Sequence, residues 1–316
     1  MTMLSVFAIT VPIYACVVVG HVAVRIGVFR REDMAVLSKL VVTFALPCLL
    51  FLAVGTRDLA AFFVPTYLAA YAVGLLVTYA LGYTYGRWRS GGQSAPSAFD
   101  GLGMAAPNSG FVGYPTLLLA LPSVAGLVLG LNLLVENLLI IPLALMLAEG
   151  AASEASRRRT ALAYARRLTR NPLLIGLLAG LLVAALGVPL PAVLTRTADL
   201  FAQAGTAVAL FAVGGVLQSW PSAATLRRVL VVSLGRLVLS PALVLGALTL
   251  LLAVGMPGLD PTLRVAVLLS AAMPVFTILP VLAHPYGESE STSAVLLVTT
   301  GLGFVTVSAL LVILGP

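Results

Sequence analysis

Long apolar runs follow one another along the chain, and short stretches rich in arginine, glycine or proline separate them. A helix needs about 20 apolar residues to cross the hydrocarbon core of a membrane. Ten runs approach or exceed that length. The pattern therefore predicts an all-α membrane protein with ten transmembrane helices, at residues 4–28, 35–55, 61–86, 97–121, 123–148, 171–188, 199–217, 228–254, 262–285 and 290–314.

The overall composition agrees with a chain that lies mostly in lipid. Of its 316 residues, 60% are hydrophobic and 9% are charged, whereas a soluble domain has about 25% charged residues. No Lys or Arg precedes the first apolar run, which begins at Leu4, so we expect a retained span and not a signal peptide. Cys16 and Cys48 both lie in apolar runs, which indicates neither a disulfide framework nor a metal site, and no cofactor is expected.

Positive charge is concentrated in alternate loops. A net charge of +7 would suggest a nucleic-acid partner for a soluble protein, but arginines between spans set membrane orientation, so no nucleic acid is expected. Of 18 Lys and Arg residues, only Arg57, Arg196 and Arg264 lie at loops of the opposite parity, and Arg236 lies within a span. The other fourteen (18 − 3 − 1) predict a multi-pass protein of the cell (inner) membrane with both termini extracytoplasmic. They are Arg25, Arg30, Arg31, Lys39, Arg87, Arg89, Arg157, Arg158, Arg159, Arg166, Arg167, Arg170, Arg227 and Arg228.

The two halves of the chain resemble each other. At an offset of 160 residues Pro12 falls on Pro172, and at an offset of 159 Pro115 falls on Pro274. Because each half has an odd number of spans, the second half must enter the membrane upside down, an arrangement typical of secondary transporters. The predicted organisation is a first repeat at 1–150, a basic cytoplasmic linker at 151–170 that can form an amphipathic surface helix, and a second repeat at 171–316.

Two spans at matched positions contain helix-breaking sequences: PNSGFVGYP at 107–115 in the fourth span and PVFTILP at 274–280 in the ninth. Proline interrupts a helix, and the freed backbone groups are tolerated at membrane depth only where protein or a wet cavity satisfies them. We therefore expect two broken helices that cross near the midplane and offer half-helix N-termini to an anion. The alternative is that both are merely kinked, since Pro and Gly are common in membrane helices.

At these residues the sequence resembles the auxin efflux carrier family, which includes the plant PIN carriers and prokaryotic carriers for malonate or malate. The resemblance covers essentially the whole chain. It implies ten helices in two inverted repeats, an elevator-like or rocking motion, broken crossover helices as in bile-acid symporters, and a homodimer. One departure is that 61–86 contains no Asp or Glu, where some plant members carry a carboxylate linked to proton handling. The matching motifs are LPCLLF (46–51), PNSGFVGYP (107–115), NPLLIGLLAGLL (171–182) and AAMPVFTILPVLAHPYG (271–287).

The resemblance implies that Asn108 binds the substrate carboxylate and that Pro115 and Pro274 set the two breaks. The Thr277 hydroxyl lies where backbone groups are freed, and Tyr114 could contact a ligand or pack at an interface. Arg236 could pair with a substrate carboxylate, replace a coupling ion, or lie beneath the cytoplasmic headgroups as a snorkelling or carbonyl-bonding side chain. The predicted substrate-binding set is Pro47, Asn108, Ser109, Gly110, Tyr114, Pro115, Arg236, Pro274 and Thr277.

Glu136 is the one acidic residue clearly near the centre of a predicted span. Asn132 lies one turn before it on the same face, and Asn137 follows it. We expect these three residues either to line a proton or ion path or to form a polar clamp between helices. Glu136 could also pair with Arg236.

The predicted function is a secondary active transporter, or a facilitative exporter, of a small organic anion that works by alternating access within the lipid bilayer. One alternative is a sodium-coupled symporter of the bile-acid transporter type. A membrane-embedded enzyme is disfavoured, because the chain has no H-E-x-x-H or G-x-S-x-G motif and no phosphate-binding glycine loop. A channel is a further alternative, since matched breaks could also line a pore.

Overall fold

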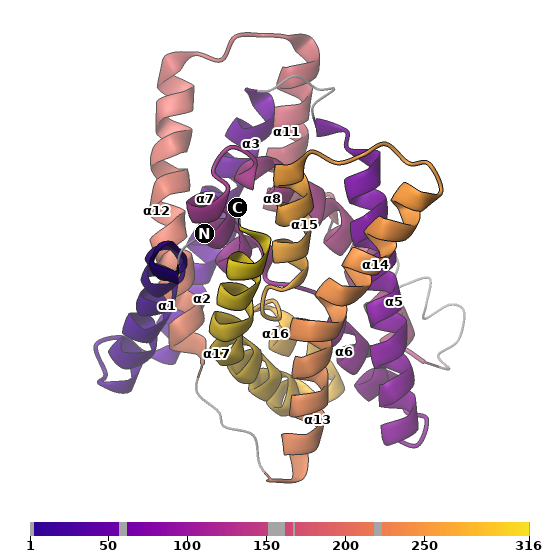
Figure 1. Ribbon diagram of the computed structural model, residues 1–316. Coiled ribbons are helices and arrows are strands. Elements are labelled where there is room, and N and C mark those ends of the chain that lie inside the picture. Colours follow the sequence, from indigo (N-terminus) through magenta and orange to yellow (C-terminus); the bar gives the residue numbers. More distant parts are fainter. Residues whose placement is uncertain (1–2, 57–61, 151–161, 167, 218–222, 316) are drawn as a thin grey trace.

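The computed structural model describes residues 3–56, 62–150, 162–166, 168–217 and 223–315. Its regular elements are helices, and this confirms the prediction of an all-α membrane protein (Figure 1). Seven helices in the described part are long and apolar enough to cross a membrane: Leu4–Arg25, Arg31–Gly55, Pro65–Arg89, Ala125–Ala148, Ala192–Val216, Thr225–Ala253 and Ser289–Leu314. Shorter apolar helices cover Ser109–Ala120, Pro172–Leu186 and Pro261–Ala271. Arg57, Arg157, Arg158, Arg159, Arg167 and most of the linker lie outside the described residues.

The α-helices are α1 (Met3–Arg25), α2 (Arg31–Leu40), α3 (Leu46–Gly55), α5 (Pro65–Arg89), α6 (Ser94–Ala105), α7 (Tyr114–Ala120), α8 (Ala125–Val135), α9 (Ile141–Ala148), α11 (Pro172–Leu186), α12 (Ala192–Val216), α13 (Ala223–Leu234), α14 (Ser240–Ala253), α15 (Pro261–Ala271), α16 (Leu279–Ala283) and α17 (Ser289–Leu314). Three π-helical turns join pairs of them, namely η1 (Val41–Ala45), η3 (Glu136–Ile140) and η4 (Gly235–Leu239), and a fourth, η2 (Ser109–Gly113), directly precedes α7. A 3₁₀ turn, η5 (His284–Tyr286), follows α16.

Each π-helical turn ends two residues before a proline: Pro47, Pro115, Pro142 or Pro241. A proline within a helix lacks a backbone N–H, and its ring collides with the carbonyl of the preceding turn. Widening that turn to the π form relieves the collision without ending the helix, and such turns are frequent at functional sites. Five residues of the predicted site lie on these turns: Ser109, Gly110, Glu136, Asn137 and Arg236.

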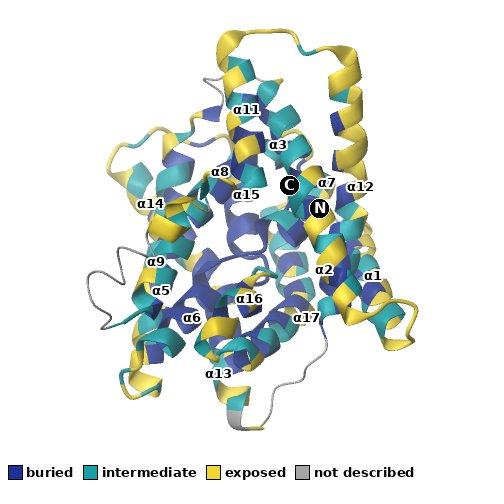
Figure 2. Cartoon of the chain, turned by 180° about the vertical axis from the view of Figure 1, so that it is seen from behind, coloured by how far each residue is buried: buried dark blue, intermediate teal, exposed yellow. Residues whose placement is uncertain are grey.

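The helix contacts fall into two groups. In the first, α1 and α2 pack on α12, and α3 packs on α11. In the second, α5 packs on α6 and α14, and α17 packs on α13 and α16. In Figure 1, α1, α2 and α12 lie on one side of the molecule and α5 and α14 on the other. The central helices α6, α8 and α15 are mostly buried (Figure 2). In contrast, α12 is exposed along much of its length, as expected of a helix that faces lipid.

Two glycines bring α1 and α12 into backbone contact. A Cβ added at Gly214 would lie 1.8 Å from the carbonyl oxygen of Val17, and one added at Gly20 would lie 2.0 Å from that of Phe211. The two contacts are reciprocal, so neither helix can accept a side chain at its glycine without moving away from the other. Small residues at such crossings let membrane helices approach closely.

We expect Gly214→Ala to lower the free energy of unfolding by about 1–3 kcal/mol, the usual effect of overpacking. Gly246→Ala is the matched control, because Gly246 is exposed on α14 and a Cβ there meets nothing within 4 Å. That variant should unfold like the wild type or slightly later, since alanine favours helix. Thermal unfolding of the purified proteins in detergent measures both effects. Equal melting temperatures for the two variants would contradict this account of the α1–α12 contact.

A cluster of ionic side chains joins α5, α6 and α13 to the start of α17. Asp100 of α6 accepts hydrogen bonds from Arg89 of α5, at 3.1 Å to one nitrogen, and from Arg228 of α13, at 2.6 Å. Arg228 also pairs with Glu288, at 2.5 Å, just before α17. Because Asp100 is almost fully buried, these cations are needed to balance its charge. The cluster belongs to the second helix group and fixes the arrangement around α6.

Candidate functional site

The two interrupted helices meet at their breaks. The chain is non-helical between α6 and Ser109, and again between α15 and α16. There Asn108 N donates a hydrogen bond to Pro274 O at 2.8 Å, and Phe276 N donates to Ala106 O at 3.3 Å. Pro107 and Val275 form an antiparallel bridge between these bonds. Backbone groups freed by one break are thus satisfied by the other, as a site at membrane depth requires.

Asn108 is the N-cap of the helix that resumes at Ser109. Its Oδ1 accepts a hydrogen bond from Phe111 N at 3.2 Å, and its Nδ2 donates to Thr277 Oγ1 at 2.8 Å. An amide nitrogen has two hydrogens, so one N–H of Asn108 is left for a ligand. The first turn of a helix also leaves N–H groups without intrahelical partners, and its dipole favours negative charge. The geometry suits a carboxylate.

Glu136 lies on the other side of this turn. Its Oε1 accepts hydrogen bonds from Tyr71 Oη at 2.8 Å and from Ser109 Oγ at 2.5 Å. Asn132 extends the network, because its Oδ1 accepts from Tyr67 Oη at 2.8 Å and its Nδ2 lies 3.5 Å from Ser109 Oγ. These hydrogen bonds link α5, η2 and the α8–η3 helix, the arrangement expected of a polar clamp, and Glu136 also lines the adjacent cavity. Its role as a proton or ion path stays a prediction.

Arg236 is fully buried and joins the ends of the two interrupted helices. One guanidinium nitrogen donates to Met104 O at 3.0 Å and to Ala105 O at 2.5 Å, at the C-terminus of α6. The other donates to Ser240 Oγ at 2.8 Å and to the carbonyl of Ala271, at the C-terminus of α15. A helix C-terminus carries roughly half a negative charge, so two of them balance the cation.

This position corresponds to the carbonyl-bonding alternative for Arg236. It does not line the cavity described below, and it forms no ion pair with Glu136 in the described part of the chain. Because the guanidinium is fully buried, contact with a ligand would require it or the surrounding helices to move.

A cavity of about 570 Å³ opens beside the break in α6–α7. Six predicted residues line it: Asn108, Ser109, Gly110, Glu136, Asn137 and Thr277. Six others do not: Pro47, Tyr114, Pro115, Asn132, Arg236 and Pro274. The volume is within the range of small-molecule sites, about 300–1,000 Å³. The cavity is also lined by four polar residues that the sequence did not indicate as part of the site: Tyr164, Arg166, Arg170 and Asn171.

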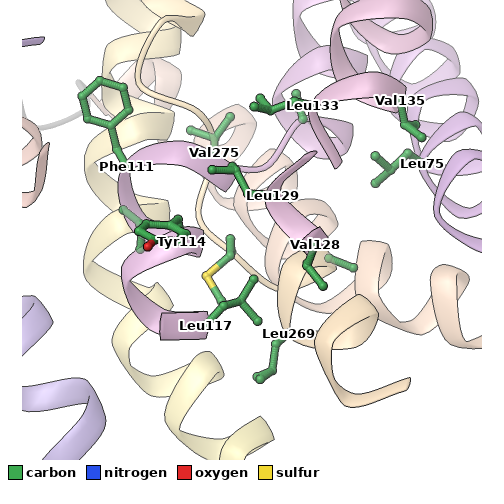
Figure 3. Close-up of a cluster of buried hydrophobic side chains, with 14 of the residues drawn as sticks. Leu75, Phe111, Tyr114, Leu117, Val128, Leu129, Leu133, Val135, Leu269 and Val275 are labelled. Carbon is green, nitrogen blue, oxygen red and sulfur yellow. The ribbon is translucent and has the colours of Figure 1, made fainter. Parts of the chain in front are cut away.

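Two residues of the sequence motifs, Tyr114 and Pro47, pack against neighbouring helices and do not line the cavity. Tyr114 belongs to the cluster of buried hydrophobic residues in Figure 3, with Leu117 of the same helix and Leu129 of α8. Pro47 lies where α3 meets α11, with its carbonyl oxygen 2.5 Å from a Cβ that would be added at Gly176. For Tyr114, of the two interpretations left open, the structure favours interfacial packing.

The segment after the undescribed part of the linker is held against the cavity. Tyr164 Oη donates a hydrogen bond to Asn137 O at 2.7 Å, and Asn171 Nδ2 lies 3.5 Å from Asn137 Oδ1. Asn137 therefore supports the linker and is not part of the Glu136 network. The sequence signal for this arrangement is weak, because arginines in a cytoplasmic linker are already explained by membrane orientation.

Tyr286 links the ninth predicted span to the end of α9. Its hydroxyl donates to Glu149 Oε1 at 2.9 Å. Burial, together with this hydrogen bond to a carboxylate, raises the pKa of Tyr286 to about 12. The hydroxyl is therefore protonated, and able to donate, throughout the physiological pH range.

The amino-acid sequence is similar to those of known membrane transport proteins. The family profile described as "Membrane transport protein" matches residues 5–312. A Rhizobium meliloti (strain 1021) protein named "Putative malonate transporter" is 28% identical over 311 residues, which cover 98% of this chain and 96% of that protein. The Escherichia coli (strain K12) "Uncharacterized transporter YfdV" is 24% identical over 206 residues, or 64% of this chain and 66% of that protein.

Proposed function

The chain belongs to the membrane transport protein family, the family indicated by its resemblance to auxin efflux carriers, and on that premise we propose that it carries a small organic anion across the membrane. The observation that carries the proposal is the cavity beside the break, lined by the N-cap Asn108, the hydroxyl of Thr277, and two arginines. Membership of a transporter family and the apolar helices favour a transporter over an enzyme.

An anion is the best-matched ligand for three reasons. The helix N-terminus at Ser109 offers backbone N–H groups and the positive end of a dipole. Asn108 keeps one N–H available, and Arg166 and Arg170 add full positive charges to the cavity wall. The similarity to a protein named as a malonate transporter supports a carboxylate as the anion.

We propose that the chain works by alternating access, with ten spans in two inverted repeats. The contact of α1 with α12 has a counterpart in the contact of α11 with α3, which is what a repeat of spans one and two as spans six and seven requires. The pairing of the two breaks supports a crossover. The arginine distribution supports a cytoplasmic linker and extracytoplasmic termini in the inner membrane. A cavity bordered by that linker would then be an inward-facing state.

The alternative functions differ in whether transport is coupled to an ion gradient. Glu136 Oε1 and Ser109 Oγ lie 2.5 Å apart, with the Asn132 amide nitrogen beside them, and this polar group could serve a sodium-coupled symporter of the bile-acid type, or a proton-coupled carrier. A channel would need no coupling and would not show exchange. No coupling ion is required if the substrate gradient or the membrane potential drives transport. The homodimer implied by the resemblance is likewise a proposal.

Counterflow in proteoliposomes tests the function. Vesicles loaded with unlabelled malonate should accumulate labelled malonate transiently, and malate and an aromatic acid should be compared with a neutral sugar. The proposal predicts saturable accumulation of at least one acid and none of the sugar. Labelled acid that equilibrates without accumulating would indicate a channel, and the absence of any acid uptake would contradict the proposal. Imposed sodium and proton gradients then identify the coupling ion.

A further inference from the structure

We propose that Arg166 and Arg170 form a second carboxylate-binding site at the mouth of the cavity, so that the preferred substrate is a dicarboxylate spanning from Asn108 to these arginines. The inference rests on the proposed function and goes further by naming the substrate class. In the sequence these arginines are explained by membrane orientation alone. Their place in the cavity wall gives them a role in binding.

Hydrogen bonds on both sides hold the two arginines at the cavity. Tyr164, two residues before Arg166, donates to Asn137 O, and Asn171, directly after Arg170, contacts the Asn137 side chain. Asn171 is also the N-cap of α11, since its Oδ1 accepts a hydrogen bond from Leu173 N at 3.0 Å. The linker is thus attached beside η3 at the site itself and does not lie free on the surface.

The arginines have no acidic partner among the residues that the structure describes. Ion pairs there join Arg89 and Arg228 to Asp100 and Glu288. The carboxylate in the cavity wall, Glu136, instead accepts hydroxyl hydrogen bonds from Tyr71 and Ser109. Two cations are therefore available to an incoming anion. An arginine fork matches a carboxylate in geometry as well as in charge.

The cavity thus has two places that attract negative charge, the helix N-terminus with Asn108 and the pair of arginines. A monocarboxylate can occupy only one of them. A dicarboxylate can occupy both, with its apolar carbons against lining residues such as Leu133 and Phe276. Both arginines are exposed to solvent, so they lose little hydration on binding and can also guide anions into the cavity.

The test compares a dicarboxylate with its own monoanionic ester. The variant is Arg166→Gln/Arg170→Gln, and the probes are malonate and monomethyl malonate in the counterflow assay. We expect the KM for malonate to rise about ten-fold or more, which corresponds to about 1.4 kcal/mol, with kcat little changed. The KM for monomethyl malonate should change much less. A loss of folding would lower kcat for both substrates and would also appear in the melting temperature.

The control variant is Arg25→Gln/Arg31→Gln, which removes the same charge from exposed positions outside the cavity on the same predicted side. It should alter neither KM. Equal KM changes for both probes, equal changes in both variants, or no change in the cavity variant would overturn the inference while leaving the transport function intact. If the wild-type protein carries none of the acids tested, the proposed function fails and this inference fails with it; if it carries only the aromatic acid, this inference alone fails.

Discussion

Replacing Arg236 by Met is expected to lower the free energy of unfolding by about 3–5 kcal/mol, the largest stability effect that we predict. Methionine fills a similar volume but cannot donate, so the carbonyl groups of Met104, Ala105 and Ala271 lose their partner in a buried environment. Each buried acceptor left without a partner costs free energy, and the ends of α6 and α15 also lose the cation that balances their dipoles.

Denaturant or thermal unfolding in detergent measures this effect, with Arg227→Met as the control. Arg227 lies on the same long helix but is exposed, so its replacement should change stability little. Arg236→Lys should give an intermediate result, because one ammonium group keeps the charge but cannot reproduce the planar fork. If Arg236→Met unfolded like the wild type, the two helix ends would be held together by other contacts.

Asn108→Asp is expected to abolish anion transport while leaving the fold intact. Aspartate is as good an N-cap as asparagine and can still accept the hydrogen bond from Phe111 N. Its carboxylate, however, removes the remaining N–H donor and sets a negative charge against the substrate carboxylate. We predict a loss of at least about 100-fold in kcat/KM, because close like charges cost several kcal/mol.

Asn108→Ala separates the two roles of this residue. It removes the cap as well as the donor, and should therefore lower stability by about 1 kcal/mol in addition to weakening transport. Thr249→Ala, on the exposed face of α14, is the control for handling and reconstitution. Wild-type transport by Asn108→Asp would show that the anion binds elsewhere.

The sequence was sufficient for the membrane class and for most helix positions, because long apolar runs leave few other structures at that composition. The fourth and ninth expected spans do contain interruptions. These are shorter than the motifs suggested, since the helices resume at Ser109 and Leu279, before Pro115 and Pro280. The seventh span was expected to begin at Asp199, but α12 begins at Ala192. The charged residues near the start of α12 interrupt the apolar run, and the expected boundary was therefore placed too late in the sequence.

The site was harder to predict because it depends on contacts between distant residues. Asn108, Ser109 and Glu136 were identifiable as polar groups within apolar spans, and they do lie together. The carbonyl partners of Arg236 are 35 to 132 residues away in sequence, so no local pattern could indicate them. Arg166 and Arg170 were explained by membrane orientation alone. In the sequence, an arginine that orients a loop cannot be told from one that lines a cavity.

The most direct test of the account asks whether an anion occupies the cavity. Cys16 and Cys48 are first replaced by Ser, and Ile278→Cys then introduces a thiol on the cavity wall, at a residue that is 41% exposed. Thr197→Cys, exposed on α12 outside the cavity, is the control. Saturating malonate should slow maleimide labelling of the Ile278→Cys variant several-fold and leave labelling of the Thr197→Cys variant unchanged. If malonate is transported but labelling at position 278 proceeds at the same rate with and without it, the cavity beside Asn108 is not the substrate site.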